Sequence, residues 1–137
     1  MRVVIDASAA LAWCYVDERT PESTKLLEYV NTNGAVVPQL WHLEVCNALI
    51  IGEIRKRITY AEMIGQLEHF RQLHIDVDNS TASLAWNSIL SIARQEKLTT
   101  YDASYVELAV RLNLALASRD KAMLNAAKKL GVDIIQF

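Results

Sequence analysis

A short run of β-branched residues near the start of the chain, residues 3–5, ends abruptly at Asp6 and two small residues, Ala7 and Ser8. Such a run predicts a buried β-strand. In an open α/β sheet, ligands gather beyond the carboxyl ends of the strands, and we expect Asp6 at that edge. The functional interpretation of Asp6 therefore depends on whether other carboxylates lie at the same edge of the sheet.

Strand patterns alternate with helix patterns along the rest of the chain. We expect strands at residues 35–38, 74–78, 114–118 and 132–136. We expect helices at residues 7–13, 21–33, 39–56, 59–73, 80–92, 99–113 and 120–130. Strands separated by helices imply right-handed crossovers, so the predicted fold is α/β, with a central parallel β-sheet of four to five strands flanked by helices on both faces. No linker or repeat divides residues 1–137, which we predict to form a single domain.

Apolar side chains predict which of these segments are buried. Residues 39–56 are apolar almost all round, which is typical of a largely buried helix. Trp13, Trp41 and Trp86 fall on apolar faces, so we expect all three in the core.

Composition restricts the class of protein. Of the 137 residues, 52% are hydrophobic and 22% are charged, which indicates a compact globule and not a disordered chain. The net charge of −2 means that a nucleic-acid partner would need a local basic patch. Cys14 and Cys46 lack metal-ligand spacing and are interpreted as reduced core thiols. No signal peptide and no apolar run near the ~20 residues of a membrane span is present, so we expect a cytoplasmic protein without membrane contact.

Glu44 is the most informative residue in the middle of the chain. It lies in the helix predicted to be buried, where an ionised carboxylate must be paired, neutralised or bound to a metal. Asn47 follows three residues later, on the same helical face. A solvent-exposed helix edge or an internal salt bridge would explain the same pattern, and both readings stay open.

Three aspartates lie at the starts of predicted helices, where a capping role and a metal-binding role require the same position. Asp6 and Asp120 each follow a predicted strand, and Asp102 lies in the capping-box pattern Thr99-x-x-Asp102. Crossover topology could bring these three and Glu44 to one pocket. Four clustered carboxylates repel one another, and a hard divalent cation such as Mg²⁺ or Mn²⁺ relieves that repulsion. Phosphoryl-transfer chemistry follows from such a site.

The four acids lie in distinctive local sequences: Val-Val-Ile-Asp6-Ala-Ser8, Leu-Glu44-Val-Cys-Asn47, Thr-Thr-Tyr-Asp102-Ala-Ser-Tyr and Ser118-Arg-Asp120-Lys121. In this order and combination they resemble the motifs of PIN-domain nucleases. The resemblance spans the whole chain and is greatest to the compact VapC-type toxins of bacterial and archaeal toxin–antitoxin pairs. It implies a PIN-like fold and a Mg²⁺- or Mn²⁺-dependent endoribonuclease.

The resemblance also implies roles for individual residues. Asp6 and Asp102 would bind the main metal ion, while Glu44 and Asp120 complete the site or hold a second ion. A metal-activated water would cleave RNA phosphodiester bonds and leave a 5′-phosphate and a 3′-hydroxyl. The supporting residues it implies are Ser8, Ser118 and Asn47.

Residues beside this site suggest how RNA could be held. Arg119 and Lys121 are the candidates for phosphate contacts. Tyr101 and Tyr105 flank Asp102 and are interpreted as packing residues, with base stacking as the alternative.

A VapC-like protein is expected to be a homodimer and to bind a cognate VapB-like antitoxin that blocks its site. We expect the apolar helices within residues 39–73 to form that surface. The alternatives are a PIN-fold RNA-processing nuclease outside a toxin–antitoxin pair, a small-molecule phosphohydrolase, and a non-catalytic binding module. The chain lacks the Asp-x-Asp pattern expected of a phosphohydrolase, because Ala7 and Ser8 follow Asp6. A non-catalytic binding module would have no reason to keep four acids.

Overall fold

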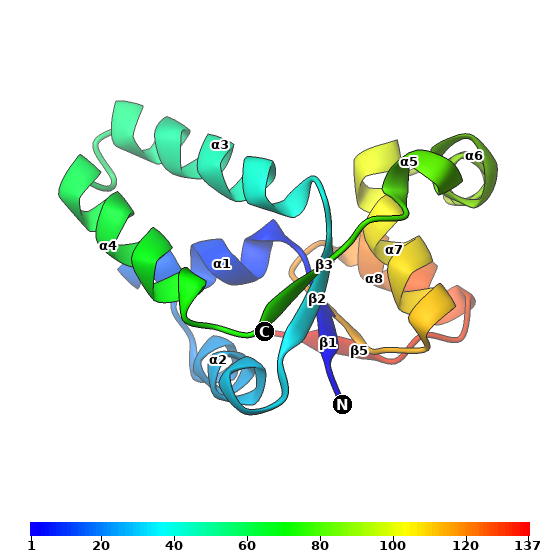
Figure 1. The fold of residues 1–137 in the computed structure, drawn as a ribbon, viewed down its shortest axis with the longest axis horizontal. Coiled ribbons are helices and arrows are strands. Elements are labelled where there is room, and N and C mark those ends of the chain that lie inside the picture. The colour runs from blue at the N-terminus through cyan, green and yellow to red at the C-terminus, as the bar shows by residue number, and fades with distance from the viewer.

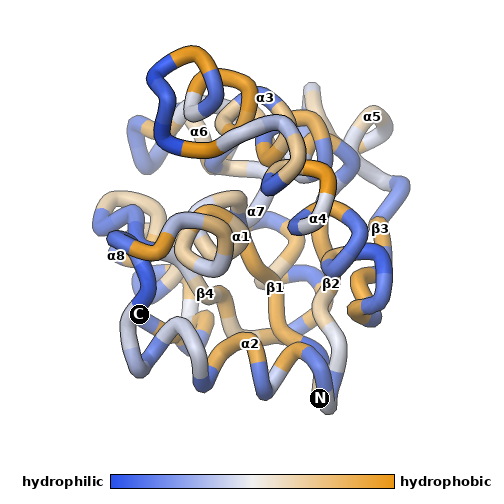
Figure 2. The backbone as a smooth tube through the Cα atoms, turned by 90° about the vertical axis from the view of Figure 1, so that its left-hand side faces the viewer, coloured by the Kyte–Doolittle hydropathy of each residue, from blue (hydrophilic) through white to orange (hydrophobic).

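The computed structural model describes residues 1–137, which fold around a five-stranded parallel sheet with the strand order β3-β2-β1-β4-β5 (Figure 1). The three central strands β1, β2 and β4 are buried at every residue, because helices cover both faces of the sheet. The hydrophobic stretch of β1 runs through the middle of the molecule (Figure 2). The strands are β1 (Val3–Ile5), β2 (Ala35–Pro38), β3 (Ile75–Asp78), β4 (Leu116–Ser118) and β5 (Ile134–Gln136). The predicted fold class is confirmed.

Helices α1 to α4 lie on one side of the sheet, and α5 to α8 lie on the other (Figure 1). None of them combines the length and the apolar character that crossing a membrane requires. In chain order the helical segments are α1 (Ala7–Cys14), the 3-10 helix η1 (Val16–Glu18), α2 (Pro21–Asn33), α3 (Trp41–Ile54), α4 (Tyr60–Arg71), α5 (Thr81–Leu84), the π-helical turn η2 (Ala85–Ile89), α6 (Leu90–Glu96), α7 (Thr100–Leu112) and α8 (Lys121–Lys129).

Strand β1 lies where the sheet changes its direction of winding. From β1 the chain steps outward through β2 to β3, with α1 to α4 as connections. It then returns across the opposite face and enters β4 on the other side of β1. The connections that follow β1 and β4 therefore leave on opposite faces, and ligands of open α/β sheets bind beyond the carboxyl ends of such a strand pair. In this chain, that edge holds Asp6 and residues 118–120.

Local signals define the ends of the helices on the first face. Thr20 caps α2, and Gly34 ends it with a φ of +83°, which glycine adopts without strain. The predicted capping box of α4 is present in both directions, since Thr59 and Glu62 exchange hydrogen bonds of 3.1 Å.

Residues 39–56 are predicted to form a largely buried helix. The helix is present as α3, but the prediction that it is largely buried is wrong. Helix α3 packs on α1, and only one side of it is covered. Gly52 allows the close approach, since a Cβ there would collide with the hydroxyl of Tyr15. Trp41, Val45 and Leu49 face inward, whereas the outer face exposes Leu43, Ile50, Ile51 and Ile54. A helix that is apolar all round does not reveal which side will be covered.

Trp86 is also placed against expectation, because its side chain is 90% exposed and does not belong to the core. The segment predicted as one helix is broken by the π-helical turn η2, in which Asn87 has non-helical dihedral angles of −112° and −105°. A π turn contains an extra residue and rotates the residues before it relative to those after it. Ile89 consequently packs inward and Trp86 points outward.

The sidedness of α3 can be tested with a matched pair of substitutions. Leu49→Ala is expected to destabilise the protein by about 3 kcal/mol, because Leu49 is fully buried and its removal leaves a cavity. Ile54→Ala on the same helix is expected to change stability by less than about 0.5 kcal/mol, because Ile54 is 74% exposed. Urea unfolding of both variants measures the difference, and equal losses would contradict the observed packing.

Candidate functional site

Asp6 follows β1 directly, and its carboxylate is held by serines on two different elements. Its Oδ1 accepts from the backbone N–H of Ser8 at 3.0 Å and from the Ser8 hydroxyl at 2.5 Å. Its Oδ2 accepts from the Ser118 hydroxyl at 2.5 Å. Ser118 can reach it because β1 and β4 are paired, with Ile5 opposite Ala117. Asp6 is thus the cap of α1 and a link between two strands, and only 6% of it is exposed.

The two serines also connect Asp6 to the turn that carries Asp120. The hydroxyl oxygen of Ser8 accepts from the backbone N–H of Arg119 at 3.1 Å, and that of Ser118 accepts from the N–H of Asp120 at 2.9 Å. Each hydroxyl therefore accepts from the turn and directs its own proton at Asp6. The Asp120 side chain caps α8 by accepting from the N–H of Met123 at 3.0 Å, and Asp120 is solvent-exposed.

Glu44 and Asp102 come from helices on opposite sides of the sheet. Glu44 is partly exposed on α3, and its Oε1 accepts a hydrogen bond of 2.5 Å from the Tyr105 hydroxyl on α7. Asp102 lies in the first turn of α7, where its N–H donates to the capping hydroxyl of Thr99 at 3.1 Å. Asp102 is only partly exposed as well. The crossover topology therefore brings acids from distant parts of the sequence to one edge.

The four acids are linked by electrostatic repulsion. Desolvation is the largest effect on Asp6, Glu44 and Asp102, and it raises the pKa of each carboxyl above its ordinary value. The charge of Asp102 further raises the pKa of both Asp6 and Glu44. The charge of Asp120 raises the pKa of Asp102. These couplings join all four acids in one region of negative potential.

The donor set fits a hard divalent cation. All four side chains offer carboxylate oxygens, which suit Mg²⁺ and Mn²⁺ better than zinc. No three acidic, histidine or cysteine side chains are gathered closely enough to hold a metal ion by themselves, so the protein alone does not form a complete cage. Mg²⁺ commonly uses one or two carboxylates together with waters and substrate phosphates, so a complete cage is not required.

The other residues proposed for this site differ in where they lie. Asn47 is exposed and forms no hydrogen bond with Glu44. The Arg119 guanidinium is engaged within the fold, because it donates to the carbonyl oxygens of Glu18 at 2.5 Å and Phe137 at 3.1 Å. Lys121 is exposed at the start of α8 and forms no ion pair, so its ammonium group faces solvent.

The two tyrosines beside Asp102 have opposite environments. Tyr101 is 65% exposed, contrary to the packing expected for it, whereas Tyr105 is 1% exposed. The bond between Tyr105 and Glu44 was not predicted. A buried tyrosine hydroxyl needs a partner, and its position one helical turn after Asp102 is the signal that could have pointed to the site.

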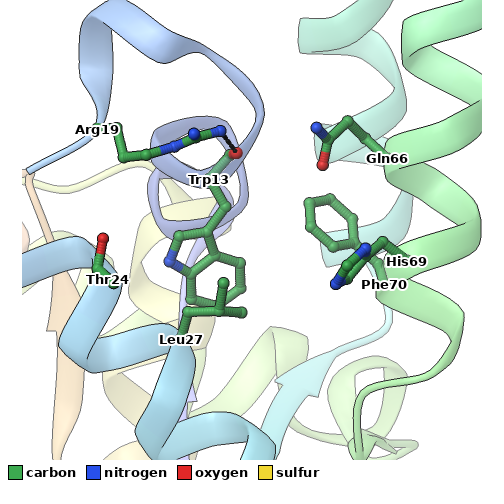
Figure 3. A pocket seen from close by; sticks show the side chains of 7 residues that line it. All are labelled: Trp13, Arg19, Thr24, Leu27, Gln66, His69 and Phe70. Atoms are coloured by element: carbon green, nitrogen blue, oxygen red, sulfur yellow. Dashed lines mark hydrogen bonds between the residues drawn. The ribbon is translucent and has the colours of Figure 1, made fainter.

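A separate cavity of about 310 Å³ lies between α1, α2 and α4 and contains none of the four acids (Figure 3). Trp13 and Phe70 form its apolar wall, in an edge-to-face arrangement with ring centres 6.1 Å apart. Arg19, Gln66 and His69 add polar groups around them (Figure 3). The acidic edge of the sheet and this cavity are therefore distinct features.

Known structures share this architecture at low sequence identity. PAE2754 from Pyrobaculum aerophilum has a TM-score of 0.72 and 21% identity, covering 98% of this chain and 90% of that one. VapBC2 from Rickettsia felis, bound to a DNA fragment from its promoter, has a TM-score of 0.69 and 12% identity, covering 100% and 99%. FitAcB from Neisseria gonorrhoeae has a TM-score of 0.66 and 14% identity, covering 97% and 96%.

At the level of sequence, no curated protein matches this chain. The PIN domain family model, in contrast, matches residues 3–129, which include all four acids and every strand except β5. The chain belongs to the PIN-domain family.

Proposed function

We propose that this chain is a divalent-metal-dependent endoribonuclease and the toxin of a VapBC-type toxin–antitoxin pair. The observation that carries the proposal is the electrostatic coupling of four acids at the edge where β1 and β4 end. PIN domains are generally nucleases that use divalent metal ions. The proposed substrate is RNA.

In this proposal, Asp6 and Asp102 hold the metal ion, and Glu44 and Asp120 complete the site. A bound Mg²⁺ or Mn²⁺ would acidify a water molecule and neutralise charge that develops on the phosphate. Ser8 and Ser118 keep both oxygens of Asp6 in fixed positions through their hydroxyl donors. Lys121, exposed beside Asp120, is available for a phosphate of the RNA.

The proposed antitoxin partner accounts for an unusual surface. Helices α3 and α4 expose a group of large apolar side chains, here named the α3–α4 surface: Leu43, Ile50, Ile51, Ile54, Tyr60 and Ile64. Exposed apolar patches of this kind mark protein–protein contacts. Two proteins of the same fold, VapBC2 and FitAcB, carry the names of toxin–antitoxin pairs. We assign the α3–α4 surface to the antitoxin and expect the toxin to be a homodimer in the cytoplasm.

RNA cleavage is expected to require both the metal ion and the acids. Asp6→Asn and Asp102→Asn are each expected to lower the rate by about 100-fold or more, since each removes a charged metal ligand. The measurement is cleavage of purified tRNA and rRNA in Mn²⁺, with end mapping for 5′-phosphates. Asp133→Asn is the matched control. Asp133 is exposed, forms no ion pair and follows α8, whereas Asp120 precedes that helix. Activity that persists in both site variants, or in EDTA, would overturn the proposal.

Burial of the Glu44 carboxyl, together with weaker repulsion from Asp102 and Asp6, predicts a pH-dependent stability of the metal-free protein. The pKa of Glu44 is raised on folding, so its contribution to stability is fully present below its ordinary pKa and is lost as pH rises through the folded-state value. Glu44→Gln is therefore expected to be more stable than the wild type near pH 7, by less than about 1 kcal/mol because the carboxyl is partly exposed.

Urea unfolding across a pH series measures this effect. The difference is expected to disappear at about pH 3.5, where the wild-type carboxyl is protonated in both states. Added Mn²⁺ is expected to stabilise the wild type more than the variant near pH 7. Glu28→Gln is the control, since Glu28 is exposed on α2 and pairs with nothing. A Glu44→Gln protein that is less stable than the wild type near pH 7 would contradict the predicted cost of keeping a charged Glu44 beside the other acids.

The α3–α4 surface can be tested without touching the acids. The double substitution Ile50→Ser with Ile54→Ser is expected to weaken antitoxin binding at least about 100-fold, because two exposed apolar anchors are lost. Calorimetry with the purified cognate antitoxin gives the affinity. Val16→Ser serves as control, because Val16 is 78% exposed on η1, outside this surface. Unchanged affinity in the double variant would exclude the α3–α4 surface as the binding site.

A further inference from the structure

Tyr105 contacts the acidic site from inside the core. Its side chain is 1% exposed and belongs to the main hydrophobic cluster, so packing immobilises the ring. Its hydroxyl donates to Oε1 of Glu44 at 2.5 Å. This is the only hydrogen bond that the Glu44 side chain accepts. Tyr105 follows Asp102 by three residues, so one face of α7 carries both an acid of the site and this donor.

Glu44 needs such a donor more than Asp6 and Asp120 do. Asp6 is buried and held by two serine hydroxyls, and Asp120 is held as the cap of α8. Glu44 has a longer side chain on a helix that is covered on one side only. Repulsion from Asp6 and Asp102 favours the rotamers that turn its carboxylate into solvent. The Tyr105 hydroxyl opposes that movement because the ring that bears it cannot follow.

We infer that Tyr105 is a positioning residue, which holds Glu44 toward Asp6 and Asp102 so that a divalent cation meets a carboxylate already in place. The inference rests on the proposed function for the presence of the cation. Tyr105 does not contact the cation or the RNA in this assignment. It acts through Glu44, as residues that hydrogen-bond a metal ligand commonly do.

The substitution Tyr105→Phe removes the hydroxyl and keeps the ring, so the core stays filled. We expect the dissociation constant for Mn²⁺ to rise about 10-fold, measured by calorimetry on the full chain, while the thermal midpoint changes little. Tyr29→Phe is the matched control, because the Tyr29 hydroxyl also makes a 2.5 Å hydrogen bond, to the carbonyl oxygen of Met1. Met1 precedes β1, whereas Asp6 follows that strand at its other end. The control is expected to bind Mn²⁺ like the wild type.

A double-mutant cycle separates positioning from a general structural effect. In a Glu44→Gln background, Tyr105→Phe is expected to cause no further loss of Mn²⁺ affinity, because the carboxylate that it positions is gone. The ¹³C signal of the Glu44 carboxyl should also shift in the single variant toward that of an exposed glutamate.

The outcomes distinguish this inference from the proposed function. Equal Mn²⁺ affinity of Tyr105→Phe and the wild type, or the same loss in both backgrounds of the cycle, would overturn the role of Tyr105 and leave the nuclease proposal intact. A wild-type protein that neither binds Mn²⁺ nor cleaves RNA would overturn the nuclease proposal and the positioning role together.

Discussion

The site depends on the hydrogen bonds that join Asp6 to Ser8 and Ser118. A buried carboxylate is costly unless its oxygens are satisfied, and here both oxygens accept from hydroxyl groups. Because Ser118 is separated from Asp6 by 112 residues, the same bonds attach the end of β4 to the end of β1. The serines also accept from the turn after β4, so the position of Asp120 is coupled to that of Asp6.

Around the hydrogen bonds of Asp6 with Ser8 and Ser118, the fold keeps the negatively charged side chains close together, although they would move apart in water. Asp102 and Asp120 lie in or before the first turn of a helix, where the helix dipole favours negative charge. Glu44 has instead a single donor from the core, Tyr105. The raised pKa values of Asp6, Glu44 and Asp102 mean that the folded state carries the cost of burying these charges and, to a smaller extent, of repulsion among them, which sites built for function commonly retain.

The outer faces of α3 and α4 show a second departure from the most stable arrangement of a monomer. The close contact between Gly52 and Tyr15 seats α3 on α1 and leaves its opposite side uncovered. Leu43 and Ile54 are both 74% exposed on that side. Covering these side chains with a partner would bury apolar surface on the helix that carries Glu44, so in the proposed complex recognition and inhibition share one element.

The sequence by itself determined the order of the elements, the parallel sheet and the acids at the ends of its strands, because strand and helix periods and capping residues are local patterns. The capping box at Thr59 shows how directly such patterns are realised. Only the tertiary structure decided which side of α3 is covered, that Trp86 points outward, and that Tyr105 meets Glu44 across 61 residues. These outcomes depend on how distant elements pack against one another, and residue spacing within a helix carries no information about what lies on the other side of the contact.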